Sequence, residues 1–341
     1  MEDPERRFHR MAPSGGVLTQ SARECSFMSF YSNRFGRLLS LPTLLVTALS
    51  AATAAGQAFE GPAPAQRGPT YVAQAPAQAS QQKPQYEVAN RGPSAADRAK
   101  QILASRDPNE HPLMPCLRWA YDGIDDIERI EDYQATMVKR ERINGKLLEH
   151  EYMFVKVRHR PFSVYMNFLG PESKKGQEVI YQEGANDGKM QAHGTGMRAM
   201  FGTVNLEPTG QIAMADNRYP ITELGLLTLV KRLIEVGEHD SQYGECEVKF
   251  FPGAKIEDRV CTCIQVKHPT PRRNFRFHVA RIYVDDEYNV PVRYEAYDWP
   301  AEEGGKPQLL EEYTYLKLKF NNNFTDADFD INNPNYNFKS K

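Results

Sequence analysis

Residues 149–193 constrain the fold of this chain most, because they form four short strand-like runs in succession. Aromatic, aliphatic and β-branched residues recur within the runs at every second position, which is typical of antiparallel hairpins. In the second run Val164 and Met166 share one face, whereas Tyr165 lies on the other. Turn residues (Gly, Pro, Asn and Asp) separate the runs, which cover residues 152–157, 162–169, 178–182 and 189–193. The stretch predicts an antiparallel sheet and indicates no particular chemistry.

Helical patterns flank this stretch on both sides. Apolar residues at intervals of three and four predict helices at 111–130 and 222–236, and residues 96–106 are compatible with a third. For the helix at 222–236, Thr222 is the expected N-cap and Gly237 is expected just past the end. The glycine-rich residues 194–210 predict an irregular strand or a flexible flap.

Further strands bring the expected total to about ten or eleven. They cover residues 133–143, 246–251, 259–267, 274–284, 290–299 and 309–320, and Asn144-Gly145 is the strongest hairpin turn. Strands and helices do not alternate over long stretches, which disfavours a parallel sheet. The pattern predicts an α+β fold in which two or more helices cover an antiparallel sheet.

The N-terminal part of the chain predicts export. Residues 38–55 are apolar, basic residues precede them, and small residues follow, as in a secretory signal peptide. The segment starts too late for such a signal unless Met28 is the true start. We therefore expect residues 1–27 to be an over-extended gene start and residues 28–58 to be the signal peptide. The alternative is a retained membrane anchor, although the run is shorter than the about 20 apolar residues that a span needs.

The next segment predicts a tether rather than a domain. Residues 59–95 are rich in Pro, Ala, Gln and Gly, and such a composition buries too little apolar surface to offset the entropy of ordering. We expect a single folded domain at 96–341. The protein should then be periplasmic or secreted, with no stable transmembrane span after cleavage.

Charge and motifs exclude several classes of function. The formal net charge is -2, without the concentrated basic face that nucleic-acid binding needs. No nucleophile elbow, phosphate loop or dinucleotide fingerprint occurs, and the histidines lack ligand spacing. Asp326, Asp328 and Asp330 resemble half of a calcium loop, but Ile331 replaces its glycine and Asn337 its glutamate. We therefore expect no catalytic residues, no metal and no cofactor, and hence not an enzyme.

The cysteines allow a disulfide in an exported protein. Cys261 and Cys263 share a face of one predicted strand, and Cys246 lies on the predicted strand before it. One hypothesis is a bridge from Cys246 to Cys261 or Cys263. The other is that these are buried thiols that pack as small hydrophobes.

Two sets of residues resemble known families. The closing segments ARIYVDDEYNVPVRYEAYDWP and LLEEYTYLKLKFNNNFTDADFDINNP resemble the end of the periplasmic lipoprotein-carrier superfamily. The segments RPFSVYMNFLGPESKKGQEVIYQEGANDGKMQAHG and YPITELGLLTLV, within about 110–338, resemble an uncharacterised bacterial secreted family, domain of unknown function 1571. The first resemblance implies a strongly curved sheet, a half-open β-barrel. The second implies no activity or catalytic residue.

Two functions are compatible with these observations. In the first, the protein is a non-enzymatic binding protein that holds a lipid, acyl chain or other apolar ligand in the cleft of a half-barrel. In the second, it is a structural or protein-interaction module of the cell envelope, with a filled core and an envelope protein as partner. The candidate ligand-binding residues are Phe154, Phe162, Val164, Met166, Phe168, Tyr181 and Met190. The same side chains would form the core in the second case.

Overall fold

The structure is a computed structural model that describes residues 92–338. The expected over-extended start (1–27), the signal peptide (28–58) and all but the last four residues of the linker (59–95) lie outside the described residues. All described residues belong to one compact unit, Glu60–Lys341.

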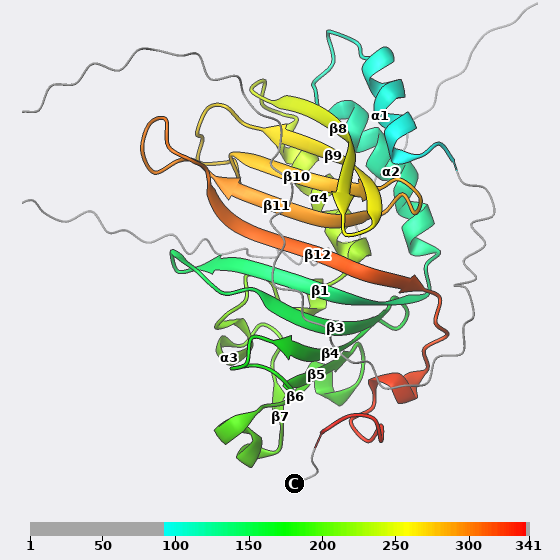
Figure 1. Ribbon diagram of the computed structural model, residues 1–341, viewed down its shortest axis with the longest axis vertical. Helices are drawn as coiled ribbons and strands as arrows, with labels where there is room; N and C mark the ends of the chain where they lie inside the picture. Colours follow the sequence, from blue (N-terminus) through cyan, green and yellow to red (C-terminus); the bar gives the residue numbers. More distant parts are fainter. Residues whose placement is uncertain (1–91, 339–341) are drawn as a thin grey trace, which may run out of the picture. The chain divides into compact units, whose positions relative to one another are not determined.

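One antiparallel sheet of 12 strands organises this unit (Figure 1). The strand order is β7-β6-β5-β4-β3-β1-β12-β11-β10-β9-β8, and β2 pairs only with β1. The sheet is not closed, because β7 and β8 end the order without pairing with each other. The strands are β1 (Asp132–Ile143), β2 (Lys146–Leu147), β3 (Glu151–Arg158), β4 (Ser163–Gly170), β5 (Glu178–Gln182), β6 (Met190–His193), β7 (Thr203–Leu206), β8 (Glu247–Ile256), β9 (Arg259–Lys267), β10 (Val279–Asp285), β11 (Pro291–Asp298) and β12 (Gln308–Phe320). The predicted α+β class and antiparallel sheet are confirmed.

The opening stretch of four strands is also confirmed, as β3 to β6. The preceding turn forms as expected: Asn144 and Gly145 both have positive φ, 49° and 80°, as a tight two-residue hairpin turn requires. Arg142 then pairs with Leu147. The glycine-rich residues 194–210 contain the short strand β7 and the 3₁₀ turn η2, so the predicted strand is present in shortened form.

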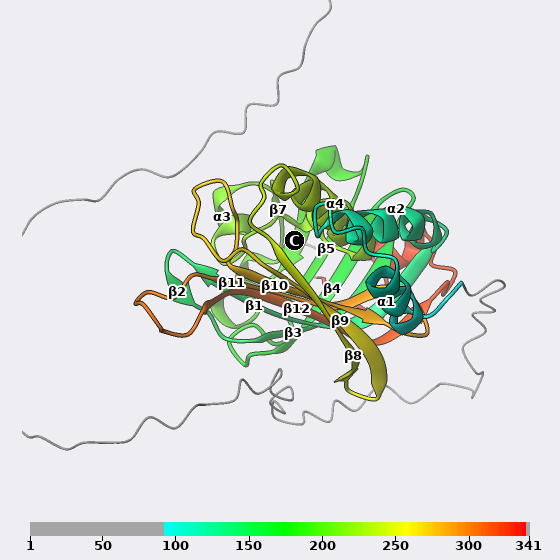
Figure 2. The same ribbon diagram turned by 90° about the horizontal axis from the view of Figure 1, so that it is seen from above.

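Helices lie on one side of the sheet. Figure 2 shows α2 and α4 lying together above the strands, and α1 packs against β8 and β9. The helices are α1 (Ala95–Ala104), α2 (Met114–Glu128), α3 (Gln211–Met214) and α4 (Leu226–Asp240), and the 3₁₀ turns are η1 (Asn186–Gly188), η2 (Gly196–Phe201), η3 (Ile221–Glu223) and η4 (Asp326–Phe329).

The predicted limits of α4 were wrong for physical reasons. Thr222 lies within the 3₁₀ turn η3, and Gly225 is the N-cap of α4 instead. Gly237 lies inside the helix, which continues to Asp240. A Cβ atom at Gly237 would lie 2.9 Å from Cδ2 of Leu117 on α2. This glycine therefore permits a close crossing of two helices rather than ending one of them.

The predicted end of the strand at 246–251 was also wrong, because Pro252 and Gly253 do not end it. The strand continues through these residues to Ile256, and a register shift between Phe251 and Ala254 marks a bulge. Proline fits at a bulge on an edge strand, where its missing N–H leaves no ladder bond unmade. The strand predicted to start at residue 274 begins at Val279.

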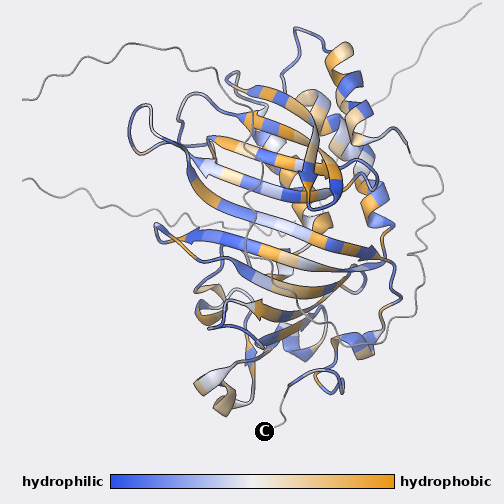
Figure 3. Ribbon diagram, viewed as in Figure 1, coloured by the Kyte–Doolittle hydropathy of each residue, from blue (hydrophilic) through white to orange (hydrophobic). Residues whose placement is uncertain are grey.

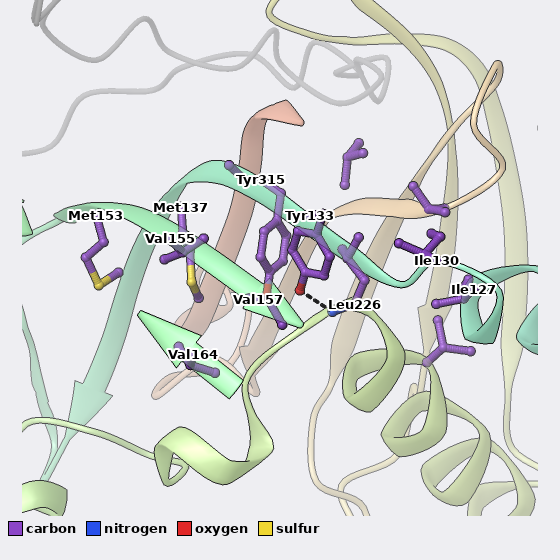
Figure 4. Close-up of a cluster of buried hydrophobic side chains, with 14 of the residues drawn as sticks. Ile127, Ile130, Tyr133, Met137, Met153, Val155, Val157, Val164, Leu226 and Tyr315 are labelled. Carbon is purple, nitrogen blue, oxygen red and sulfur yellow. Dashed lines mark hydrogen bonds between the residues drawn. The ribbon is translucent and has the colours of Figure 1, made fainter. Parts of the chain in front are cut away.

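The main core lies between the sheet and helices α2 and α4. We call this side of the sheet the inner face. Apolar side chains from α2 and α4 pack there against inward-facing residues of β1, β3 and β12 (Figure 4). Tyr133, Val155, Val157 and Leu226 in this cluster are fully buried. Burial of this apolar surface is the main force that holds the unit together.

Candidate functional site on the inner face

The inner face carries a continuous apolar row across five strands. The registers place Val155 opposite Met166, Met166 opposite Val179, Val179 opposite Ala192 and Ala192 opposite Val204. Residues directly opposite one another in a sheet share a face. All five belong to the main core or pack against it. The row runs from β3 to the edge strand β7.

Six of the seven candidate ligand-binding residues join this row on the inner face. Val164 is fully buried, and Phe168, Tyr181 and Met190 are nearly so. Phe162 and Met166 are partly buried and pack against the same cluster. The structure therefore brings these six together: Phe162, Val164, Met166, Phe168, Tyr181 and Met190.

Phe154 lies on the opposite face. It contacts a separate cluster formed by Tyr165, Ile180 and Phe329, together with aromatic residues of the C-terminal segment 322–338. Lys156, two residues further along β3, donates to Oδ1 of Asp328 at 2.7 Å and lies 5.1 Å from the ring centre of Phe324. The chain thus covers Phe154 with its own C-terminal residues. The strand alternation alone places Phe154 on this face, since Val155 next to it points inward.

An irregular segment covers the β7 end of the inner face. Residues 194–225, which we call the covering segment, connect β6 to α4. They contribute Val204, Leu206, Ala213 and Leu224 to the surroundings of the main core. Over β1 and β12 the helices α2 and α4 fill this role, whereas the covering segment consists of two 3₁₀ turns, one short strand and the four-residue helix α3.

The covering segment also presents apolar side chains to solvent. Met197, Met200 and Phe201 in η2 are 84%, 86% and 69% exposed, and Ile212 in α3 is 76% exposed. These are the four most exposed large hydrophobic residues in the described part of the chain. Met197, Met200 and Phe201 belong to one turn, and exposed apolar groups that lie together mark binding surfaces more often than scattered ones do.

Charged side chains replace apolar ones toward the other end of the inner face. Tyr133, Ala135 and Met137 of β1 point inward, and the same alternation continues with the buried Lys139 and Glu141. Figure 3 shows this change as a blue stretch of β1 toward its arrowhead. The nitrogen Nζ of Lys139 lies 3.0 Å from Glu151 and 3.4 Å from Glu141. These ion pairs satisfy charges that would otherwise be costly to bury.

This charged cluster holds the covering segment to the sheet. Lys174 pairs with Glu151 and lies 3.1 Å from Asp216, and Lys139 donates to Asn217. Nε of Arg218 donates to Glu311 at 2.9 Å. Residues 216–218 lie shortly after α3, which ends at Met214. The covering segment is therefore fixed by ion pairs near its C-terminal end.

Burial dominates the electrostatics of this cluster. Burial raises the pKa of Glu311, Arg218 acts in the opposite direction, and the neighbouring Glu141 raises it further. Burial also raises the pKa of Tyr219 to about 12, and Glu311 adds to the shift. The charged residues Lys139 and Glu141 occupy inward-facing positions in the alternation of β1, and this pattern could have predicted the cluster from the sequence. The sequence-based prediction did not include it.

The predicted disulfide is absent from the structure. Cys116, Cys246, Cys261 and Cys263 are free thiols. Cys246 precedes β8, whose first residue Glu247 pairs with Lys267 at the far end of β9. Cys261 pairs with Ala254 instead, near the other end of the hairpin. A separation of several residues along a strand exceeds the Cα distance of at most about 7 Å that a disulfide allows.

Residues 92–338 contain no group of three or more His, Cys, Asp or Glu side chains that could hold a metal ion. The calcium-like residues have other contacts, since Asp326 accepts from Arg158 at 2.8 Å and Asp328 pairs with Lys156. None of the helices in this range has the length and apolar character that a membrane crossing needs.

Several solved structures are similar to this chain at low sequence identity. The lipoprotein LppX of Mycobacterium tuberculosis matches 61% of this chain and 96% of its own, with 11% identity and a TM-score of 0.36. A DUF1329 family protein from Desulfovibrio piger matches 64% and 98%, with 11% identity and a TM-score of 0.33. A LolA superfamily protein from Nitrosomonas europaea matches 70% and 98%, with 11% identity and a TM-score of 0.24.

Sequence comparison identifies the family. No curated protein matches the chain significantly. A family profile does match, and it covers residues 130–338, which is more than half of the chain. The segments that carried the resemblance to this family in the sequence, 160–194 and 219–230, both lie within that match. The chain belongs to the family described as protein of unknown function DUF1571.

Proposed function

We propose that this protein is an exported, non-enzymatic binding protein that holds a lipid, an acyl chain or another apolar ligand. The ligand would lie between the inner face of β3 to β6 and the covering segment, with the open sheet acting as a half-barrel. The six inner-face candidates would contact it. Export would depend on the signal peptide expected at 28–58, ahead of the linker at 59–95 and the folded domain at 96–341.

One observation carries this proposal. The end of the apolar row next to β7 is covered by the irregular, glycine-containing residues 207–225, which contribute Ala213 and Leu224, rather than by a long packed helix. Few backbone hydrogen bonds hold such a segment together, so its local opening costs less free energy than the displacement of a long helix. Opening it would expose an apolar surface of the kind that binds apolar ligands. The charged cluster would mark the polar end of that surface.

A second candidate function is favoured by a different observation. Val164, Val179, Tyr181 and Ala192 are already nearly or fully buried by the protein itself. A core filled in this way needs no ligand. The domain would then be a structural or interaction module of the cell envelope, with its exposed surface contacting an envelope protein.

Lipid analysis of a matched pair of proteins tests the choice. We would purify the protein and its Ala192→Phe variant from membrane-containing cells without detergent and quantify lipids in organic extracts by mass spectrometry. Ala192 lies in the apolar row, so a phenyl ring there would occupy the space of a ligand. A carrier should contain close to one lipid per protein, and the variant should contain much less. A filled core predicts no lipid in either protein and a lower Tm for the variant, because overpacking costs about 1–3 kcal/mol.

A further inference from the structure

The most exposed apolar residues of the covering segment form one short turn. Met197, Met200 and Phe201 all belong to the 3₁₀ turn η2. We call these three residues the apolar tip. They pack against no core cluster of the described residues, unlike Val204 and Leu206 that follow them. Hydrophobic burial therefore does not account for the presence of these three side chains.

Glycines fix the geometry of this turn. Gly196 and Gly202 have positive φ angles of 60° and 65°, a region that other residues rarely adopt. At Gly194, a Cβ atom would lie only 2.6 Å from Cβ of Arg198. The glycines thus allow a tight turn at the place where the chain leaves β6. The turn leaves the three apolar side chains in solvent.

A cation accompanies the apolar tip. Arg198 lies between Met197 and Met200 and is exposed. Within residues 92–338 its guanidinium makes no ion pair or hydrogen bond with another side chain, in contrast to Arg218 and Arg232. An unpaired guanidinium is available to bind phosphate oxygens. Apolar side chains beside a free cation match the interfacial zone of a bilayer, where acyl chains lie beneath phosphate groups.

We propose that the apolar tip docks onto the surface of a phospholipid bilayer. Met197, Met200 and Phe201 enter the boundary between headgroups and acyl chains, while Arg198 binds lipid phosphate. This inference rests on the proposed function, because an apolar ligand has to pass between a membrane and the protein without crossing water. Docking through the covering segment would place the lipid surface next to the segment that has to open.

Vesicle sedimentation tests the docking. The full chain, without its signal, is mixed with vesicles of phosphatidylcholine alone or with about 30% phosphatidylglycerol, which adds anionic surface charge. We expect wild-type protein to bind both and to bind the anionic vesicles more strongly. The triple variant Met197→Ser/Met200→Ser/Phe201→Ser should lose at least about tenfold in affinity for both, because it lacks the buried apolar area.

Two further variants make the test specific. Arg198→Gln should lose the preference for anionic vesicles and keep most of its affinity for phosphatidylcholine. Leu103→Ser on α1 is the matched control, since Leu103 is also exposed, at 57%, but lies outside the covering segment. It should bind like wild type. All tip side chains are exposed, so the variants should keep the wild-type Tm.

The inference is overturned if wild-type protein binds neither vesicle, which would leave an envelope protein as the partner of the tip. It is also overturned if the triple variant binds as well as wild type. Lipid extraction separates this failure from failure of the proposed function. Protein that contains lipid but does not sediment with vesicles disproves docking alone. Protein that sediments with vesicles but contains no lipid disproves the carrier function and leaves docking intact.

Discussion

The phenol oxygen of Tyr133 accepts a hydrogen bond from the backbone N–H of Leu226 at 3.0 Å (Figure 4). Tyr133 is the second residue of β1, and Leu226 is the first residue of α4. Gly225, the N-cap of α4, has no side chain to satisfy this N–H. A side chain of the sheet therefore does what an N-cap side chain does in an isolated helix. The contact couples the start of α4 to the centre of the core.

Loss of this hydroxyl should destabilise the protein. Tyr133→Phe keeps the ring and leaves a buried N–H without a partner, which costs about 1–3 kcal/mol. Urea unfolding followed by circular dichroism measures the difference. Tyr121→Phe is the control, because its hydroxyl bonds to Glu238 on the protein surface and its loss should cost at most about 0.5 kcal/mol. Equal losses in the two variants would contradict the capping role.

A side chain at Gly225 should destabilise the same junction. Gly225 has a φ of 124°, and a Cβ atom there would lie 3.0 Å from the Tyr133 hydroxyl. We expect Gly225→Ala to cost about 1–3 kcal/mol through backbone strain and the displaced hydroxyl. Gly244→Ala is the matched control, since its Cβ would meet nothing within 4 Å. Thermal unfolding of both variants checks the prediction, and a stable Gly225→Ala protein would contradict it.

These contacts show which features the sequence reveals and which it does not. The faces of Val164, Met166 and Tyr165 followed from local alternation, because a strand has a fixed period of two. The role of Gly237 did not follow, since only the position of Leu117 on another helix explains it. Local patterns determine strands and helices, whereas the reason for a single residue depends on segments that meet only after folding.

The candidate site likewise contains some residues whose position the sequence predicts and others whose position it does not. Six of the seven candidate residues lie together because they share one strand face, which alternation predicts. Phe154 is separated from them, and its cover comes from Phe324 and Phe329, about 170 residues further along the chain. The inward charges of β1 were visible in the sequence. Their partners Asn217 and Arg218 were not, because no periodicity links them to β1.

Arg218 should contribute far more to the free energy of unfolding than a similar arginine whose partner is exposed. Its partner Glu311 is 5% exposed, so Arg218→Met leaves a buried carboxylate with one cation fewer. We expect the free energy of unfolding to fall by about 3 kcal/mol near neutral pH. This is the lower end of the range for a broken buried ion pair, because Arg218 itself is 29% exposed. Arg232→Met is the control. Arg232 is 28% exposed, but its partner Glu223 is 35% exposed, and the expected loss is at most about 1 kcal/mol.

The loss in Arg218→Met should also depend on pH. Burial already raises the pKa of Glu311 in the folded state, and removal of Arg218 raises it further. The folded variant therefore binds a proton more readily than the unfolded chain. The variant's loss of unfolding free energy relative to wild type is largest above the raised folded-state pKa of Glu311, and it shrinks as the pH falls toward the ordinary glutamate value. Unfolding measured at several pH values checks the sign, and a deficit that grows in acid would contradict it.

The C-terminal segment should detach in acid before the domain unfolds. Burial works to raise the pKa of Asp328, but the hydrogen bond from Lys156 and the bonds from Thr325 outweigh it, and the pKa is lowered. Such a carboxylate contributes stability above its unfolded pKa and loses it as the pH falls through the folded value, below the ordinary aspartate range. Hydrogen exchange of residues 322–338 across this range measures the detachment.

Asp328→Asn should weaken protection of this segment already at neutral pH and remove part of its acid dependence. Asp330→Asn is the control, because Asp330 is exposed and bonds only to Asn332 and Asn333 nearby. Protection that is unchanged in Asp328→Asn would show that the aromatic contacts alone hold the segment.

The four thiols within residues 92–338 should be unreactive in the folded protein. Burial raises the pKa of Cys116, Cys246, Cys261 and Cys263 to about 12 each, so almost no thiolate is present near neutral pH. The thiolate is the reactive form. Reaction with Ellman's reagent at pH 8 should therefore be slow in buffer and complete in urea. The register of β8 with β9 further predicts that non-reducing peptide mapping finds no bridge from Cys246 to Cys261 or Cys263. Such a bridge would require β8 and β9 to pair in a register shifted by several residues. The hydrophobic pattern of the strands specifies the observed register instead.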